Sequence, residues 1–223
     1  MRRDALVRAL REAGHKLIQL MDTSQSSLLV LPYGARVLGL FPGDRANLLW
    51  VNPSLGDTKA AIEFFRSPGW RNTGGDRTWI SPERDLHVRD LENPWNSYEV
   101  THSIDPGKYT VTSNDHEVRL ATEGSVRQHR VGRECAIHLE KSIRLVPNPL
   151  RYEPGAEDLR KQVFYAGFEQ TTSHFKTSYS PLKSRPLTRP VALPESGEQG
   201  CTENKGLNHA PQPLAMDQSV LVK

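Results

Sequence analysis

One stretch of the chain combines aromatic rings with polar side chains suited to binding hydroxyl groups. All four tryptophans lie between positions 50 and 95, and polar residues are interleaved with them. Sugars present apolar C–H faces and a rim of hydroxyls, so indole rings beside hydrogen-bond donors and acceptors are their physical complement. The pattern indicates carbohydrate binding, and the candidate substrate-binding residues are Trp70, Asn72, Asp76, Arg77, Trp79 and Glu83.

The tryptophans themselves allow more than one role. Trp50 lies inside an apolar run, which predicts a place in the core. Trp79 fits a core or a site equally, whereas Trp70 follows Pro68 and Gly69 in a loop, which favours the surface or a site.

Arg77 is the strongest candidate for ligand contact. Its guanidinium is able to grip a carboxylate, a phosphate or a pair of sugar hydroxyls. On a strand, Arg77 and Trp79 would share one face while Asp76 and Thr78 took the other. A structural alternative stays open, in which Arg77 pairs with Asp76 or Glu83 and Glu83 accepts hydrogen bonds from loop amides.

Two histidines are candidates for a catalytic general acid. His87 lies just beyond the tryptophan-rich stretch, and His138 lies on the polar face of a clearly alternating strand. Each fits equally a solvated or hydrogen-bonded histidine with no catalytic role. The eight histidines show no paired spacing, so no metal or cofactor is predicted, and the Gly-X-Ser-X-Gly pattern of many hydrolases does not occur.

The sequence resembles the galactose-mutarotase-like (aldose 1-epimerase-like) superfamily, in an uncharacterised branch of it. Two stretches carry the resemblance: Leu29-Val-Leu-Pro-Tyr-Gly-Ala-Arg-Val-Leu-Gly-Leu40, followed by Asn47-Leu-Leu-Trp-Val-Asn-Pro53, and Gly74-Gly-Asp-Arg-Thr-Trp-Ile-Ser-Pro-Glu83. The similarity covers residues 17–83 and continues more weakly to about Gln170. It implies an antiparallel β-sandwich that holds a sugar in a cleft on a concave sheet.

The resemblance also implies a reaction and a departure from it. In catalytic relatives a carboxylate takes the proton of the anomeric hydroxyl while a histidine protonates the ring oxygen, so acid and base must flank one sugar. That carboxylate usually lies late in a chain longer than this one. We therefore expect a partial sandwich without the base, that is, a catalytically incomplete, carbohydrate-binding fragment with Arg77 in its site.

Two other functions remain open from the sequence. One is a working sugar epimerase or a glycoside-processing enzyme, which needs a carboxylate facing a histidine or two carboxylates across a cleft. The other is a non-catalytic structural or interaction protein that self-associates through exposed sheet edges.

The elements that must position these residues are mostly strands. Asp4 to Gly14 predicts an amphipathic helix with Asp4 as N-cap and Gly14 just past its end, and Asp57 to Phe65 predicts a helical turn capped by Asp57. Residues 67–76 predict a loop with unusual backbone conformations. The predicted strands are Leu17–Met21, Ser27–Leu31, Arg36–Phe41, Asn47–Val51, Ser97–His102, Lys108–Thr112, Glu117–Thr122, Ala136–Leu145 and Lys161–Phe168.

Composition separates one domain from a tail. Residues 1–176 predict the partial β-sandwich, whereas residues 177–223 are rich in Pro, Ser and Gly and predict a disordered tail. The chain is 25% charged and carries a formal charge of +3 without a basic cluster, so nucleic acid is not expected as a partner. The two cysteines, together with the lack of an apolar signal or membrane-length run, predict a cytoplasmic protein.

Overall fold

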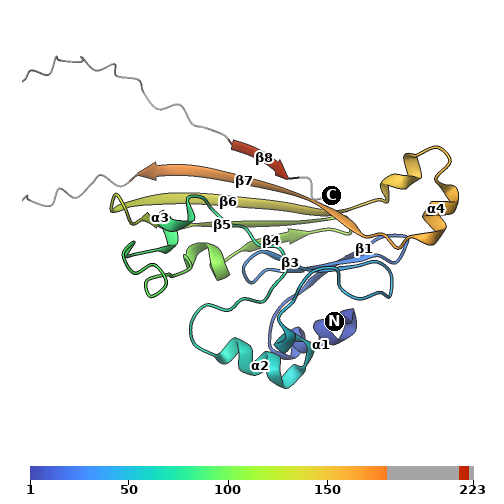
Figure 1. Ribbon diagram of the computed structural model, residues 1–223, viewed down its shortest axis with the longest axis horizontal. Coiled ribbons are helices and arrows are strands. Elements are labelled where there is room, and N and C mark those ends of the chain that lie inside the picture. The colour runs from blue at the N-terminus through green and yellow to red at the C-terminus, as the bar shows by residue number, and fades with distance from the viewer. Residues whose placement is uncertain (180–215, 221–223) are drawn as a thin grey trace, which may run out of the picture.

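The protein has a mainly β, three-layered fold (Figure 1). The computed structural model describes residues 1–179 and 216–220. Its two antiparallel sheets and N-terminal helix confirm the predicted β-sandwich class. The helices are α1 (Arg3–Glu12), η1 (Pro53–Gly56), α2 (Thr58–Arg66), α3 (Glu83–His87), η2 (Ser103–Gly107), η3 (Pro149–Tyr152) and α4 (Glu157–Gln162), and the strands are β1 (Ile18–Met21), β2 (Ser27–Leu31), β3 (Arg36–Phe41), β4 (Thr110–Ser113), β5 (Glu117–Gln128), β6 (Arg133–Val146), β7 (Gly167–Tyr179) and β8 (Met216–Val220).

The N-terminal helices form the first layer. Helix α1 confirms the predicted helix, and Gly14 follows it with φ of 84°. The prediction of Asp4 as N-cap is wrong, because Arg2 holds that position and Asp4 lies in the first turn. In α2 the predicted cap is confirmed, since the Asp57 carboxylate accepts the Ala60 N–H at 2.9 Å.

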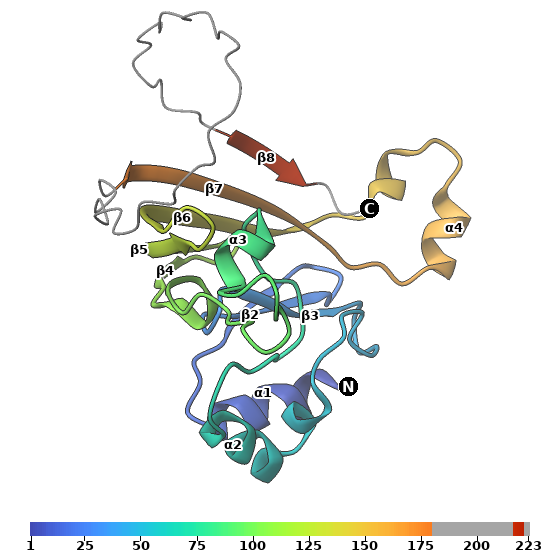
Figure 2. The same cartoon turned by 60° about the vertical axis from the view of Figure 1, so that its left-hand side comes forward.

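The three-stranded sheet, in the order β1-β2-β3, is the middle layer. Every residue of β2 and β3 is buried, because α1 and α2 cover one face and the larger sheet covers the other (Figure 2). The sequence of a strand that is buried on both faces is apolar throughout instead of alternating between apolar and polar residues. Arg36 is the charged exception, at the first position of β3.

The five-stranded sheet, in the order β4-β5-β6-β7-β8, forms the third layer. Strand β6 confirms the predicted alternation: Ile137, Leu139 and Ile143 are buried against the rest of the protein, and His138 lies on the other face. We call these the inner and outer faces. Lys141 breaks the pattern, because its position on β6 points inward and its side chain is fully buried.

Three predicted strands are wrong. Residues 47–51 form bends, with a single bridge from Val51 to Gly74, and residues 97–102 contribute one bridge, from Tyr98 to Val88. Within 161–168 the chain ends α4, passes through a loop and begins β7 only at Gly167. Hydrophobicity alone favours a strand in these stretches, but none of them pairs with a neighbouring strand over its predicted length.

Helices η3 and α4 belong to an excursion between β6 and β7 that extends from one end of the sheet (Figures 1 and 2). The predicted disordered tail, residues 177–223, lies largely outside the described residues; its described parts are 177–179, which end β7, and β8, which pairs with β7. Among the described residues no helix is long and apolar enough to cross a membrane.

Candidate functional site

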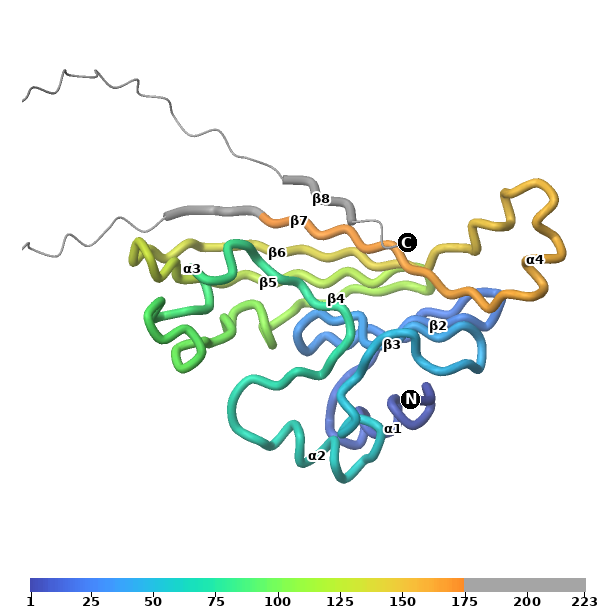
Figure 3. Tube along the Cα trace, viewed as in Figure 1, coloured from blue at the N-terminus to red at the C-terminus, as the bar shows by residue number. Residues whose placement is uncertain are grey.

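Residues 67–82, which we call the glycine loop, run along the edge of β3 and carry most of the substrate-binding residues that the sequence singled out. Figure 3 traces it from α2, past β3, to α3. Gly74 and Gly75 have φ of 84° and 73°, and their backbones approach so closely that a Cβ on Gly75 would lie 2.3 Å from the Val37 carbonyl oxygen. This contact lets Asp76 bridge to Val37, so the paired glycines fix where Asp76 and Arg77 project.

A buried ion pair anchors the loop from below. The Arg36 guanidinium donates to Asp105 Oδ2 at 2.6 Å, and the two side chains are 1% and 4% exposed. Arg36 also donates to the Gly74 carbonyl oxygen at 3.0 Å and more weakly to Asn72 Oδ1 at 3.4 Å. Strand β3, the glycine loop and η2 are thereby tied together by one side chain.

Asp105 also contacts Trp70 and Arg77. Its Oδ2 accepts the indole N–H of Trp70 at 2.9 Å, and Arg77 Nη1 lies 3.8 Å from the same oxygen. The structural alternative for Arg77 is therefore wrong in its partner, because the carboxylate that it faces comes from η2 and not from Asp76 or Glu83.

Planar groups stack outward from this point. The guanidinium carbon of Arg77 lies 4.9 Å from the ring centroid of Trp70 and 3.7 Å from that of Trp79. Trp79 in turn stacks on His87, with centroids 4.6 Å apart, and His87 lies 5.9 Å from Tyr98. Cation–π contacts of this kind contribute about 0.5–2 kcal/mol each. We call this row of side chains the planar stack; its members, in order, are Trp70, Arg77, Trp79, His87 and Tyr98.

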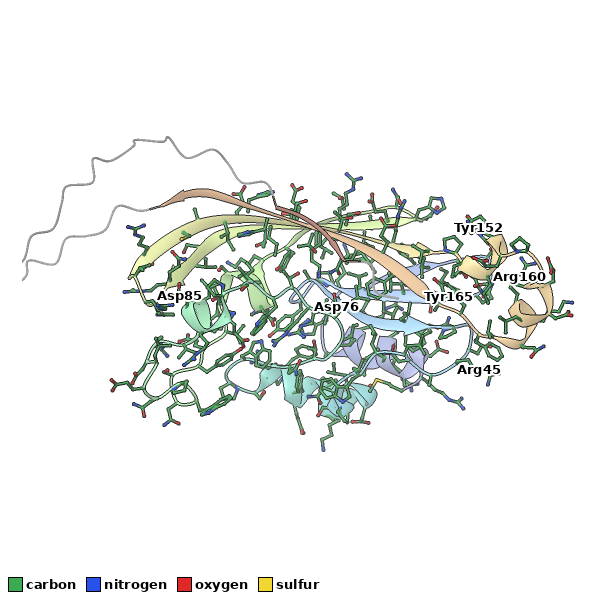
Figure 4. The ribbon with its side chains drawn as sticks, turned by 45° about the horizontal axis from the view of Figure 1, so that its top comes forward. Arg45, Asp76, Asp85, Tyr152, Arg160 and Tyr165 are labelled. Carbon is green, nitrogen blue, oxygen red and sulfur yellow. The ribbon has the colours of Figure 1, made fainter. Side chains whose placement is uncertain are left out.

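Lys141 reaches the same region from the opposite sheet. Its ammonium donates to the Ala35 carbonyl oxygen at 2.9 Å and lies 4.0 Å from Asp76 Oδ2. Complete burial lowers the pKa of Lys141 to about 8, an effect that Asp76 opposes and the nearby positive charge of Arg36 reinforces. Asp76, labelled in Figure 4, thus lies between the two sheets, with one carboxylate oxygen facing a buried cation.

Several polar atoms of this cluster are buried without a hydrogen bond to the described protein. They are Arg36 Nε, Asp76 Oδ2, Arg77 Nη1, Thr78 Oγ1 and Asp105 Oδ1. Most buried polar atoms in proteins are hydrogen-bonded, so five exceptions around one loop distinguish this region from the rest of the described protein.

The predicted substrate-binding residues divide into two groups. Trp70, Arg77 and Trp79 come together in the planar stack, and Asp76 lies beside them. Asn72 has a structural role, since its Oδ1 accepts from both Arg36 and the Gly74 N–H.

Glu83 is separate from this first group. It is exposed at the start of α3 and accepts the Tyr98 hydroxyl at 3.1 Å rather than loop amides. It therefore supports the far end of the planar stack.

The tryptophans differ in their surroundings. Trp50 is 60% exposed, so its predicted place in the core is wrong. Its backbone carbonyl accepts the Gly75 N–H at 2.8 Å, and its ring lies so close to Gly74 that a Cβ there would be 2.8 Å from it. Trp95 is 91% exposed and lies outside the stack, whereas Trp70, at 36%, combines an accessible ring with a fixed orientation.

The two candidate catalytic histidines lie on opposite sides of the larger sheet. His87 is buried on α3, which packs against the inner face through Leu86, and burial lowers the pKa of its imidazole. His138 lies on the outer face between Glu140, at 2.8 Å, and Glu123, at 3.2 Å, and the hydrogen bond to Glu140 raises its pKa. The two imidazoles cannot serve one substrate molecule.

The outer face also has a hollow of about 260 Å³. Short side chains from β4 to β7, including Ala121, Ser142 and Ser173, form its floor between the longer Arg119 and Glu140. None of the predicted substrate-binding residues lines it. Its charged residues already have partners: Arg119 pairs with Glu117, Glu140 pairs with His138, and Lys141 faces Asp76.

Sequence reasoning missed Arg36, Asp105 and Lys141. The sequence does contain an indication of Arg36 and Lys141, because each is a charged residue at a position where the pattern of its strand predicts a buried apolar one. It contains none for Asp105, in η2, since a short polar turn gives no indication of which distant residues it contacts.

Neither metal chemistry nor a known relative adds to this picture. In residues 1–179 and 216–220 no group of three His, Cys, Asp or Glu side chains is arranged to hold a metal ion. Comparison of the chain with protein-family models, with curated proteins and with solved structures gave no match.

Proposed function

We propose that the protein binds a carbohydrate or sugar derivative at the loop formed by Trp70, Asp76 and Arg77. One observation carries the proposal: consecutive residues Asp76, Arg77 and Thr78 each have a buried polar atom without a hydrogen bond, beside a partly exposed indole. A sugar satisfies both demands, since its hydroxyls are donors and acceptors and its C–H faces are apolar.

The geometry assigns a role to each residue. The indole of Trp70 is held in place by its hydrogen bond to Asp105 and offers an apolar face to the sugar ring. Asp76 keeps 39% of its side chain exposed, so it can accept hydroxyl protons, and Arg77 keeps 28% exposed, so it can donate. Trp79 is less available as a platform because Arg77 and His87 contact its ring.

Binding is favoured over turnover by the positions of the histidines. Ring opening needs an acid and a base on opposite sides of one sugar. His138 lies on the outer face of the larger sheet, and His87 is buried behind Trp79. Neither histidine flanks the sugar in this arrangement.

Isothermal titration of the full chain with a panel of hexoses, uronic acids and sugar phosphates tests the proposal. We expect saturable binding of at least one of them, weakened about two- to thirteenfold by Trp70→Ala, because stacked aromatic contacts contribute about 0.5–1.5 kcal/mol. The matched control is Trp95→Ala, which removes an exposed indole outside the site. No saturable binding by the wild-type chain at millimolar sugar would refute the proposal.

A Trp70→Phe variant separates the ring from its N–H group. It keeps a stacking surface but loses the hydrogen bond to Asp105. Affinity between those of the wild type and Trp70→Ala supports a platform oriented by Asp105, whereas an affinity equal to the wild type shows that this hydrogen bond does not orient the platform.

A further inference from the structure

Charge at the proposed site is unbalanced. Three cations face two carboxylates in this region: Arg36 and Arg77 contact Asp105, and Lys141 lies 4.0 Å from Asp76 and within the field of Arg36. Arg36 and Asp105 are almost completely buried, and Lys141 is fully so. A partly desolvated cluster with one excess positive charge is stabilised by an added anion.

The excess charge belongs to Arg77. Asp105 Oδ2 already receives Arg36 at 2.6 Å and the Trp70 N–H at 2.9 Å, so Arg77 is left with a contact of 3.8 Å and no hydrogen bond from Nη1. Lys141, by contrast, donates to a carbonyl oxygen and faces Asp76.

The planar stack also limits how a ligand can approach Arg77. The guanidinium is flanked by the rings of Trp70 and Trp79, so its edges remain for a partner, and the edges carry the N–H donors. Paired N–H groups on one edge match the two oxygens of a carboxylate or phosphate, which a lysine ammonium does not match.

We infer that the ligand is an acidic sugar derivative, bearing a carboxylate or phosphate group that binds the edge of Arg77. The inference rests on the proposed function and narrows its ligand class. The sugar ring lies against the exposed part of Trp70 and donates a hydroxyl hydrogen bond to Asp76. The anionic group pairs with Arg77, whose positive charge is the one left in excess.

Titration with four probes separates this inference from the proposed function. The probes are glucuronate, glucose 6-phosphate, glucose and inorganic phosphate, each added to the full chain at one ionic strength. We expect glucuronate or glucose 6-phosphate to bind at least about tenfold more tightly than both glucose and inorganic phosphate. Comparison of the two acidic sugars decides between a carboxylate and a phosphate group.

Variants of Arg77 test whether this residue supplies the preference. Arg77→Gln should lower the affinity for the acidic sugar to that for glucose. Arg77→Lys keeps the positive charge but not the paired N–H donors of the guanidinium, so it should retain only part of the preference for the acidic sugar. Arg119→Gln is the matched control, because that arginine forms an ion pair on the outer face. Tryptophan fluorescence and circular dichroism check that each variant is folded, and Arg77→Lys retains the test should Arg77→Gln unfold.

Each contrary outcome has a distinct meaning. Glucose binding as tightly as the acidic sugars overturns the inference and leaves the proposed function standing. Inorganic phosphate binding as tightly as glucose 6-phosphate, with no response to glucuronate or glucose, overturns both, because the site then recognises the anion without the sugar. Loss of the preference in Arg119→Gln, but not in Arg77→Gln, assigns the anion to the outer face and overturns the inference.

Discussion

Charged side chains meet on both faces of the larger sheet, with different consequences. On the inner side, Arg36 and Asp105 are almost fully buried and hold Trp70, the glycine loop and η2 together. On the outer face, Arg144 and Glu169 pair at 2.9 Å while remaining 58% and 37% exposed. The inner pair loses its hydration, so it contributes to stability mainly through the groups that it positions. Water screens the outer pair, so that pair contributes little.

Breaking each pair in turn gives the largest expected difference. Asp105→Ala leaves Arg36 buried without its carboxylate and removes the acceptor of the Trp70 indole, so we expect a loss of about 3–5 kcal/mol in the free energy of unfolding. Glu169→Ala should cost no more than about 1 kcal/mol. Urea denaturation measures both, and similar losses in the two variants would contradict the contrast.

The glycine loop gives the next largest effect. Gly75→Ala forces a side chain into a φ of 73° and against the Val37 carbonyl, so we expect a loss of about 2–3 kcal/mol. Gly132 has a similar φ of 65° but open space around it, so Gly132→Ala isolates the cost of the backbone conformation at about 1 kcal/mol. Equal losses in urea denaturation would show that the close approach to β3 does not matter.

The next effect is smaller and depends on pH: it is the difference in stability that a buried lysine, Lys141, causes and an exposed lysine does not. The pKa of Lys141 falls from 10.5 in the unfolded chain to about 8 in the fold, so between these values the unfolded chain binds more protons and stability rises with pH. One proton contributes at most about 1.4 kcal/mol per pH unit. Denaturation at pH 8 and 9 should show this rise in the wild type and in Lys161→Met, an exposed control, but not in Lys141→Met.

An unchanged rise in Lys141→Met would assign the effect to another group. The charged groups that face Lys141 are Asp76 and Arg36, and both are present in the wild type and in Lys141→Met. The comparison therefore isolates the buried ammonium.

Local patterns predicted the elements, and long-range contacts determined the site. Strands β2 and β3 were predicted with the bounds that they have, and Asp57 was recognised as a cap, because hydrophobic runs and capping side chains act within a few residues. The sequence also selected Arg77 and Trp79, which do lie together. It did not reveal that Asp105, 28 positions after Arg77, supplies the carboxylate, since that pairing depends on how η2 packs beside β3.

The same limit explains the wrong predictions. Residues 47–51 are apolar enough for a strand, yet the glycine loop bridges to both Val51 and Val37, and Leu48 makes a single backbone hydrogen bond to Leu40 of β3. Trp50 consequently turns outward instead of entering the core. Propensity describes what a segment favours, and the available partners decide what it forms.

The indole N–H signals in a two-dimensional ¹⁵N–¹H NMR spectrum test the central claim most directly, because the chain has four tryptophans in different surroundings. Addition of glucuronate or glucose 6-phosphate should shift the Trp70 signal, assigned with Trp70→Phe, in a saturable way. The signal of the exposed Trp95, which lies outside the site, should stay in place. A Trp70 signal that does not respond to any sugar tested, or a response confined to Trp95, would contradict the proposed site.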